Sequence, residues 1–365
     1  MSNETIPMIT AESLQTLAES ILLEAKRQGA SQAAVNLAAN KGYTVTAHDG
    51  DVETVEYHQD KVLDITVYFG KRSGSASITD LRADAVKKAV EAACHIAKYT
   101  DEDPDSGLAD KEDLAFNYPE LQLAFPWALT VPEAIEMAIQ CEREAMACDP
   151  RIMSAEASTV STSEALVLYA NSHGFVGQFP YTRHELSCIL IAKEGDDMQR
   201  DYSYTLASDP NRLLSLSEIA KEAALRTVQR LGARKVPTGK TPVIFQAEEA
   251  RGLIGHFCSA VSGGNLYRKS SFLLDHLGKK IFPDFMQVQE KPHLPYALSS
   301  TPFDNDGVTT RENVFIDKGV LQSYALGSYS ARKLGMKTTG NAGGVFNLTV
   351  DHHGIGLNAL LKEMD

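Results

Sequence analysis

The sequence has 365 residues and a formal net charge of −13, with 43% hydrophobic and 23% charged residues. This length allows two or three domains, each with a sizeable core. A surface this acidic repels phosphate backbones, which argues against general nucleic-acid binding. No run approaches 18 apolar residues, so the sequence predicts no membrane-spanning helix.

The cysteines and the N-terminus indicate a cytoplasmic protein. The five cysteines are dispersed and none forms a Cys-x-x-Cys pair, a pattern that favours reduced thiols. Met1 to Glu12 lacks the basic region and apolar core of a signal peptide. We therefore expect cytoplasmic localisation.

Residues 1–110 predict an α+β domain. Apolar residues at helical spacing predict a helix over 12–27, with Thr10 as its N-cap and Gly29 after its end. Two hairpins follow, the first turning at Asp49-Gly50. Their expected strands are 43–47, 52–57, 65–69 and the region around 75–77. A second helix begins after Asp80.

Residues 111–235 predict a second α+β domain, which follows an acid-rich connection at 101–113. The expected elements are a helix at 132–148, strands at 165–169, 175–179, 184–192 and 201–206, and a helix at 217–231. The strands cluster and do not alternate singly with helices. This favours an α+β fold with largely antiparallel sheets over a doubly wound parallel sheet.

Residues 236–365 predict a β-rich C-terminal domain. A short strand, Pro242-Val243-Ile244, precedes a helix that opens near Ala247, and a Gly-rich loop follows it. A hairpin is expected over Asn313–Tyr324, turned by Asp317-Lys318-Gly319. The last residues, 357–365, predict a helix without a Gly or basic cap.

The helix after Ala247 stands where a peptidase would carry a metal-binding helix. Zinc needs at least three ligands at about 2.0 to 2.3 Å, and a zinc helix places two imidazoles on one face with a glutamate as base. Here Glu248 and Glu249 are followed by Leu253. His256 and Cys258 are two positions apart, so they diverge on a helix and are expected to be structural. We therefore expect no metal in this chain.

Two further segments carry short functional patterns. Asp101 to Glu112 is similar to a calcium loop, but its glycine, Gly107, falls one place late and Pro104 interrupts the turn. A solvated linker is the favoured interpretation. Ser330-Ala331-Arg332-Lys333 matches the Ser-x-x-Lys pattern of acyl-transfer enzymes without its companion motifs, so a plain basic helix end is favoured.

Two loops complete the candidates. Ser262-Gly263-Gly264-Asn265, with Arg268 and Lys269, could cradle an anion, although it matches no P-loop and a flexible turn is favoured. His352-His353 has no third ligand nearby, and we expect it on a surface loop.

Several blocks together resemble the TldD/PmbA family, and within it the PmbA (TldE) branch. They are Asp64–Tyr68, Gly74–Ser77, Asn171–Gly174, Arg200–Tyr202, Gly264–Leu274, Ser300–Asp304, Ser328–Gly335 and Thr339–Gly344. The likeness covers residues 30–365. The family comprises predicted metallopeptidases once called modulators of DNA gyrase, and its usual C-terminal domain is longer, so the resemblance implies that residues 236–365 are an incomplete domain.

The resemblance also implies a site. The TldD branch carries a His-Glu-x-x-x-His helix and a later cysteine ligand. The corresponding positions here are Glu248, Glu249 and Leu253, so both imidazoles are absent. Glu249 is the candidate catalytic position, whereas Glu248 and Leu253 match metal ligands without the chemistry to replace them.

The resemblance implies partners and a function. A PmbA-type subunit pairs with a TldD-type subunit, which would carry the zinc, in a heterodimeric peptidase of unfolded peptides and microcin-type precursors; a homodimer is the other expected assembly. Two alternatives remain open: a non-catalytic protein-binding regulator related to gyrase or to a toxin–antitoxin system, and a metallopeptidase using Glu248, Glu249 and His256 as unusual ligands.

Overall fold

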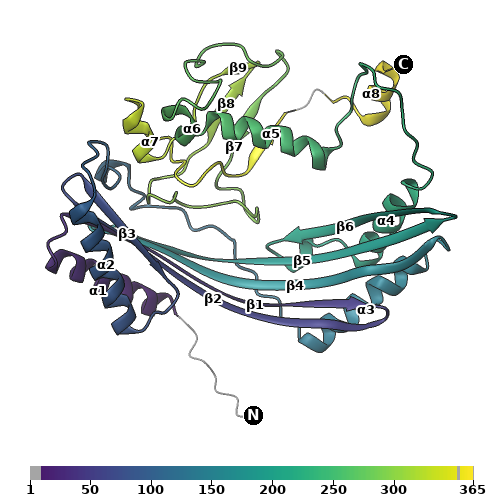
Figure 1. Cartoon of the computed structure of the whole chain (residues 1–365), viewed down its shortest axis with the longest axis horizontal. Helices are drawn as coiled ribbons and strands as arrows, with labels where there is room; N and C mark the ends of the chain where they lie inside the picture. The colour runs from purple at the N-terminus through teal and green to yellow at the C-terminus, as the bar shows by residue number, and fades with distance from the viewer. Residues whose placement is uncertain (1–9, 352–353, 365) are drawn as a thin grey trace.

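The computed structural model describes residues 10–351 and 354–364, so His352, His353 and Asp365 lie outside the described residues. The first two thirds of the chain build one six-stranded antiparallel sheet, in the order β3-β2-β1-β4-β5-β6 (Figure 1). Its strands are β1 (Gln32–His48), β2 (Asp51–Phe69), β3 (Arg72–Ile78), β4 (Ile152–Asn171), β5 (Val176–Glu194) and β6 (Asp197–Ala207). The antiparallel α+β prediction is confirmed.

The strands are longer than the sequence predicts. The expected strands 52–57 and 65–69 are parts of one strand, β2, and 175–179 and 184–192 are parts of β5. Polar residues lie between the predicted segments, such as Gln59, Asp60 and Lys61 in β2. In the folded sheet the centre is not covered by helices, so polar side chains are tolerated there. The sheet also runs through both predicted N-terminal units, and the boundaries 1–110, 111–235 and 236–365 stay a prediction.

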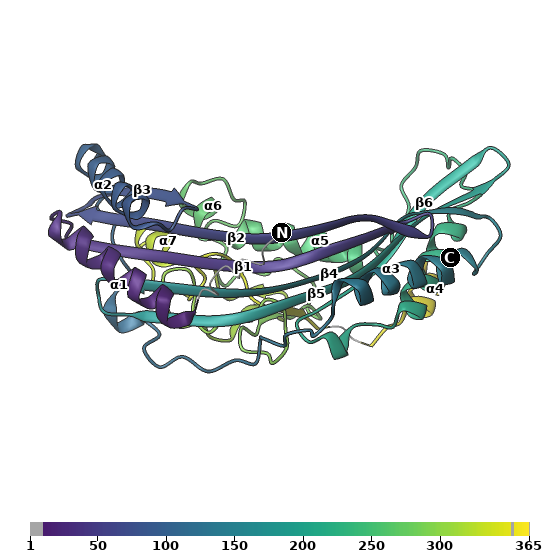
Figure 2. The same cartoon turned by 90° about the horizontal axis from the view of Figure 1, so that it is seen from below.

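Four helices cover one face of this sheet, in two pairs. α1 (Ala11–Arg27) and α2 (Ala83–Tyr99) lie at one end, and α3 (Val131–Met146) and α4 (Leu216–Gln229) at the other (Figures 1 and 2). Along β1, Val35 and Leu37 pack beneath the first pair, whereas Val45 and Ala47 pack beneath α3. All four residues have odd numbers, and alternate residues of a strand point to the same face of the sheet. Both helix pairs therefore pack on the same face.

Capping residues determine where these helices begin. Thr10, Thr130 and Ser215 precede α1, α3 and α4, and each forms a capping box with the residue three positions later. Each box satisfies two backbone N–H groups that the first helical turn leaves free. The predicted Thr10 cap is therefore confirmed.

The C-terminal part lies on the opposite side of the long sheet from the four helices (Figure 1). It contains α5 (Ala247–Val261), α6 (Gly263–Tyr267), α7 (Ser328–Lys333) and α8 (Leu357–Glu363). Its small sheet has the order β10-β7-β8-β9, formed by β7 (Val288–Glu290), β8 (Asn313–Asp317), β9 (Val320–Leu321) and β10 (Leu348–Val350). The hairpin turn predicted at 317–319 is confirmed, with Lys318 and Gly319 both at positive φ.

One predicted element is wrong. Pro242-Val243-Ile244 forms no strand, and Val243 is 63% exposed. A lone apolar tripeptide has no β preference strong enough to form a strand without a neighbouring strand to pair with. The segment is instead an extended connection that leads into α5.

An aromatic cluster joins the C-terminal part to the long sheet. Phe303 packs against Phe175, which directly precedes β5, with ring centroids 5.3 Å apart, edge to face. A Cβ atom at Gly177 would lie 2.5 Å from the Phe303 ring, and one at Gly307 would lie 2.6 Å from the Tyr169 ring. Glycine at both positions therefore allows this close packing.

Replacing Gly74 by alanine should destabilise the protein. A Cβ atom at Gly74 would lie 2.3 Å from the Ala93 carbonyl oxygen and 2.4 Å from the Ala97 nitrogen of α2, so the helix would have to move. We expect a loss of about 1–3 kcal/mol, as for other overpacked sites, measured by urea unfolding.

The matched control is Gly252→Ala. Gly252 lies within α5, and a Cβ atom there would meet nothing within 4 Å. Alanine should leave stability unchanged or raise it by up to about 1 kcal/mol. Equal effects of the two substitutions would contradict close backbone packing between β3 and α2.

Candidate functional site

Helix α5 carries the residues that the sequence singled out. Glu248 lies in its first turn and accepts two hydrogen bonds from the Arg226 guanidinium of α4, at 2.9 Å and 3.3 Å. The hydrogen bonds that Arg226 donates to Glu248, and then to Glu222, raise the pKa of Arg226. Glu248 is thus part of an ion pair between α5 and the central helices.

The remaining candidate positions on α5 face open surface. Leu253 is 50% exposed, and Glu249 and His256 are also exposed. Cys258 is half-buried, and burial raises the pKa of its thiol. The structure therefore does not bring His256 and Cys258 together with Glu249 around one point.

The chain's own side chains at this helix do not fit a zinc ion. Leucine has no lone pair to donate, and Glu248 already neutralises Arg226. Within residues 10–351 and 354–364, no group of three or more His, Cys, Asp or Glu side chains is placed to hold a metal. A zinc site built from these residues would therefore lack ligands.

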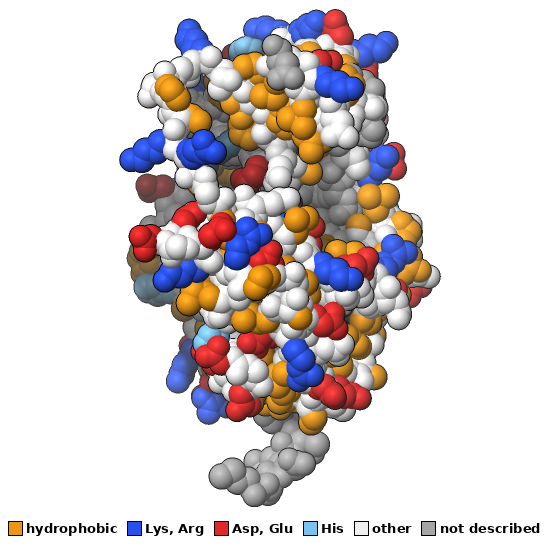
Figure 3. All heavy atoms as spheres, turned by 90° about the vertical axis from the view of Figure 1, so that its right-hand side faces the viewer, with side chains coloured by type: hydrophobic (Ala, Val, Ile, Leu, Met, Phe, Trp, Pro, Cys, Tyr) orange, Lys and Arg blue, Asp and Glu red, His pale blue; other side chains and the backbone are white. Residues whose placement is uncertain are grey.

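Apolar side chains are exposed at the end of the molecule that carries α8. Leu357 and Leu361 of α8 are exposed, and apolar side chains gather at this end (Figure 3). Figure 3 also shows a hollow between the C-terminal part and the end of the long sheet. Sequence periodicity did not indicate this surface, because α8 has only two turns.

The acidic segment after α2 binds α7 and is not a solvated linker. Lys333 forms ion pairs with Asp103 at 2.7 Å and Asp105 at 3.2 Å. Hydrogen bonds from Lys333, and then from Tyr329, lower the pKa of Asp103 to about 2. Arg332 also donates to the backbone carbonyls of this segment. These contacts give the carboxylates a cationic partner from another domain, so the linker prediction is wrong and the calcium interpretation has no support.

The same contacts argue against the interpretation of Ser330 to Lys333 as the Ser-x-x-Lys motif of an acyl-transfer enzyme. Lys333 is held by two carboxylates, and the hydrogen bond to Asp103 raises its pKa. A lysine that stays protonated cannot take a proton from Ser330. The Ser330 hydroxyl instead donates to the Gly327 carbonyl oxygen at 3.1 Å.

Two sequence candidates line one cavity of about 620 Å³ in the C-terminal part. Ser262, Gly263, Gly264 and Ser330 all line it, and a Cβ atom at Gly263 would lie 2.2 Å from the Ser330 hydroxyl oxygen, so the two segments are in contact. The anion-cradle interpretation required Arg268 and Lys269, but neither lines this cavity. The one charged residue that does is Asp306, so the site is not suited to an anion.

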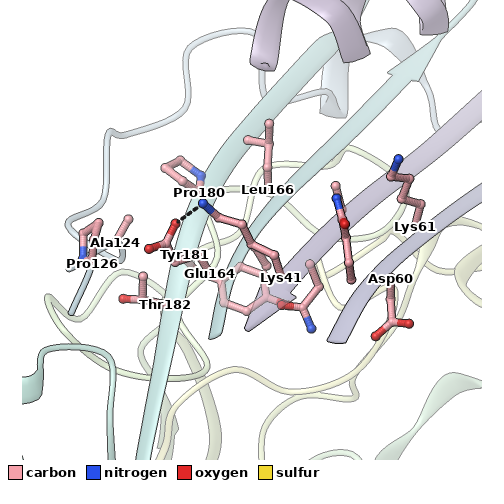
Figure 4. A pocket seen from close by; sticks show the side chains of 14 residues that line it. Lys41, Asp60, Lys61, Ala124, Pro126, Glu164, Leu166, Pro180, Tyr181 and Thr182 are labelled. Atoms are coloured by element: carbon pink, nitrogen blue, oxygen red, sulfur yellow. Dashed lines mark ion pairs between the residues drawn. The ribbon is translucent and has the colours of Figure 1, made fainter. Parts of the chain in front are cut away.

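A second cavity of about 230 Å³ lies on the long sheet, where the sequence indicated nothing. Lys41 of β1 reaches across it to Glu164 of β4, with the ammonium nitrogen 3.1 Å from a carboxylate oxygen (Figure 4). Ala39 and Lys41 share the parity of Val35 and Leu37, so this cavity lies on the helix-bearing face, between the two helix pairs. This cavity forms only because β1 pairs with β4, which is distant in the sequence.

Asp304 is a buried carboxyl group, 1% exposed, that joins its own loop to the loop around Ala342. One carboxylate oxygen accepts the N–H groups of Asp306 and Val308, each at 2.9 Å, and the other accepts that of Ala342 at 2.9 Å. Burial, and then the charge of Asp306, raise the pKa of Asp304 to about 7.

Stability should therefore fall as pH rises from about 4 to 7. The native state retains a proton on Asp304 that the unfolded state releases near its ordinary pKa of 3.8. Stability from a raised pKa is present below the unfolded value and lost on passing the folded value, here by up to about 4 kcal/mol. Asp304→Asn should show a shallower decline in urea unfolding across this range. Asp196→Asn, on the exposed β5–β6 turn, should keep the wild-type slope, and equal slopes for both variants would refute this assignment.

Comparison with known proteins places the chain in a family. Profiles described as PmbA/TldA metallopeptidase domain 1, central domain and C-terminal domain match residues 33–97, 125–231 and 238–365. The chain belongs to the PmbA/TldD metallopeptidase family. It is 44% identical to Metalloprotease PmbA of Escherichia coli O157:H7, over 98% of this chain and 78% of that protein. It is 40% identical to the PmbA homolog of Haemophilus influenzae, over 99% and 80%.

Solved structures share the fold. One from Bacteroides thetaiotaomicron, which carries the modulator-of-DNA-gyrase name, has a TM-score of 0.90 and 28% identity, over 98% of this chain and 81% of that one. TldE from Thermococcus kodakarensis has a TM-score of 0.73 at 18% identity, over 96% and 80%, and this likeness shows the fold alone. In the described part of the chain, no helix is both long and apolar enough to span a membrane.

Proposed function

We propose that this chain is the PmbA/TldE-type subunit of a cytoplasmic peptidase complex and that a TldD-type partner supplies the zinc. The observation that carries the proposal is α5, where Glu248 pairs with Arg226 and Leu253 stands in place of an imidazole. A family of metallopeptidases supplies the reaction class, and the residues of this helix support a metal that is held by the partner.

The proposed substrates are unfolded peptides, including microcin-type precursors. The 44% identity to a protein named Metalloprotease PmbA supports a role in peptide hydrolysis. In this arrangement the chain contributes surfaces that bind the peptide and the partner. Hydrolysis takes place at the partner's metal.

Metal content and activity test the proposal directly. The purified chain should contain zinc far below one equivalent and should not cleave an unfolded peptide such as reduced, carboxymethylated casein. Addition of a TldD-type subunit from the same organism should restore cleavage, and a chelator should abolish it. Stoichiometric zinc together with hydrolysis by this chain alone would overturn the proposal.

Substitution at Glu249 distinguishes the proposal from a metallopeptidase with unusual ligands. Because Glu249 has no metal-bound water beside it, Glu249→Gln should leave the rate of the reconstituted complex within about twofold. The matched control replaces the glutamate of the partner's His-Glu-x-x-x-His helix by glutamine, which should abolish cleavage. A large loss with Glu249→Gln would support ligation by Glu248, Glu249 and His256.

A second candidate function is a non-catalytic regulator that contacts gyrase or a toxin–antitoxin system. The gyrase-modulator name of a structural neighbour favours it. The net charge of −13 disfavours contact with DNA, so such a role would depend on protein contacts. Affinity capture that recovers gyrase without any TldD-type subunit would favour this function.

A further inference from the structure

The cavity of about 620 Å³ beside α7 has a defined chemical character. It lies between the C-terminal end of α5, α6, α7 and the glycine-rich loop at 341–345. Hydroxyl, amide and carboxylate groups come from the lining residues Ser259, Tyr267, Asp306, Tyr329, Ser330 and Asn341. These groups suit a polar ligand that donates hydrogen bonds.

Asp306 supplies the only charge among the lining residues. One of its carboxylate oxygens accepts the Ser328 N–H at 2.9 Å. The other oxygen has no partner within the described residues, and the side chain is only partly exposed. A carboxylate that is partly removed from water, with one oxygen free, favours a cationic partner.

Two buried carboxyl groups lie behind the cavity wall. Ala342 lines the cavity and donates its N–H to Asp304, while Asn341 donates its amide to Glu290 at 2.8 Å and 3.0 Å. Glu290 is 1% exposed and accepts further hydrogen bonds, from the Asn313 amide and the Phe346 N–H. Because burial raises the pKa of both carboxyl groups, the negative charge that faces the cavity comes from Asp306.

The nearest cations are held by other groups, and the Arg268 guanidinium reaches only the rim of the cavity, where it donates to the Tyr267 hydroxyl and the Asn265 amide oxygen, each at 3.4 Å. Lys333 is held by Asp103 and Asp105, and Arg268 lies over the Tyr267 ring, 5.4 Å from its centroid. Neither residue lines the cavity. A phosphate or carboxylate ligand would therefore meet repulsion, whereas an ammonium group would meet a carboxylate and several hydroxyl acceptors.

We propose that this cavity binds an ammonium group of the peptide substrate, with Asp306 as its counter-ion. The ammonium group comes either from the peptide's N-terminus or from a lysine side chain. This inference rests on the proposed function, because it gives this subunit a specific part in holding the peptide.

Direct binding to the purified chain tests the inference. The probes are three alanine pentapeptides with a C-terminal fluorophore: one with a free N-terminus, one acetylated, and one acetylated with a central lysine. Fluorescence anisotropy should show binding of the free-amine peptide that is at least about 10-fold tighter than that of the acetylated peptide. Tight binding of the acetylated lysine peptide would identify the side chain as a second source of the ammonium group.

Substitutions test whether the preference for the free-amine peptide arises in the cavity. Asp306→Asn keeps an oxygen for the Ser328 N–H and should remove the preference for the amine, whereas Asp196→Asn removes the same charge from a distant exposed turn and should retain it. Ser259→Trp, at an exposed cavity position, should weaken binding of the amine peptide without altering the unfolding temperature. If Asp306→Asn is too unstable to measure, the effect of Ser259→Trp on binding of the amine peptide tests whether the cavity is the binding site.

Equal binding of the free and acetylated peptides would overturn the inference, as would equal losses in Asp306→Asn and Asp196→Asn. Neither result would bear on the proposed function, since cleavage by the reconstituted complex is measured separately. Conversely, loss of cleavage with an intact amine preference would refute the peptidase role and leave the binding site in place.

Discussion

The pairing of β1 with β4 is the constraint on which the rest of the structure depends. It runs from Ala34 opposite Asn171 to Ala47 opposite Ser158, and it joins strands separated by more than one hundred residues. Because the side-chain period of a strand is two, this register places both helix pairs on one face of one sheet. The opposite face is left for the C-terminal part, which contacts it through the aromatic cluster around Phe303.

Charged residues then connect the domains. Glu248 pairs with Arg226, and Asp103 and Asp105 pair with Lys333, so each pair joins the C-terminal part to an earlier segment. Isolated surface ion pairs contribute little, but networks that include backbone carbonyls, like that of Arg332, also determine orientation. The carboxylates that were candidate metal or calcium ligands thus hold the domains together.

The cavity beside α7 follows from the same arrangement. Asp304 and Glu290 are buried because they organise the loops around residues 301–310 and 341–346 through backbone and amide hydrogen bonds. Burial raises the pKa of both groups, because their charged forms lose hydration there. The cavity beside these loops has one charged lining residue, Asp306, and this charge suits it to a cation.

The sequence by itself determined the local elements and the missing zinc ligands. The Thr10 cap and helical spacing located α1, the sequence placed α3 and α4 near their observed bounds, the Lys318-Gly319 turn located the hairpin, and Leu253 was identified as a residue that cannot bind a metal. Tertiary structure alone decided the single long sheet, the absence of a strand at 242–244 and the ion-pair partners of Glu248 and Lys333. Local preference acts over a few residues, whereas strand pairing, ion pairs and cavities depend on residues far apart in the chain, whose meeting no local pattern records.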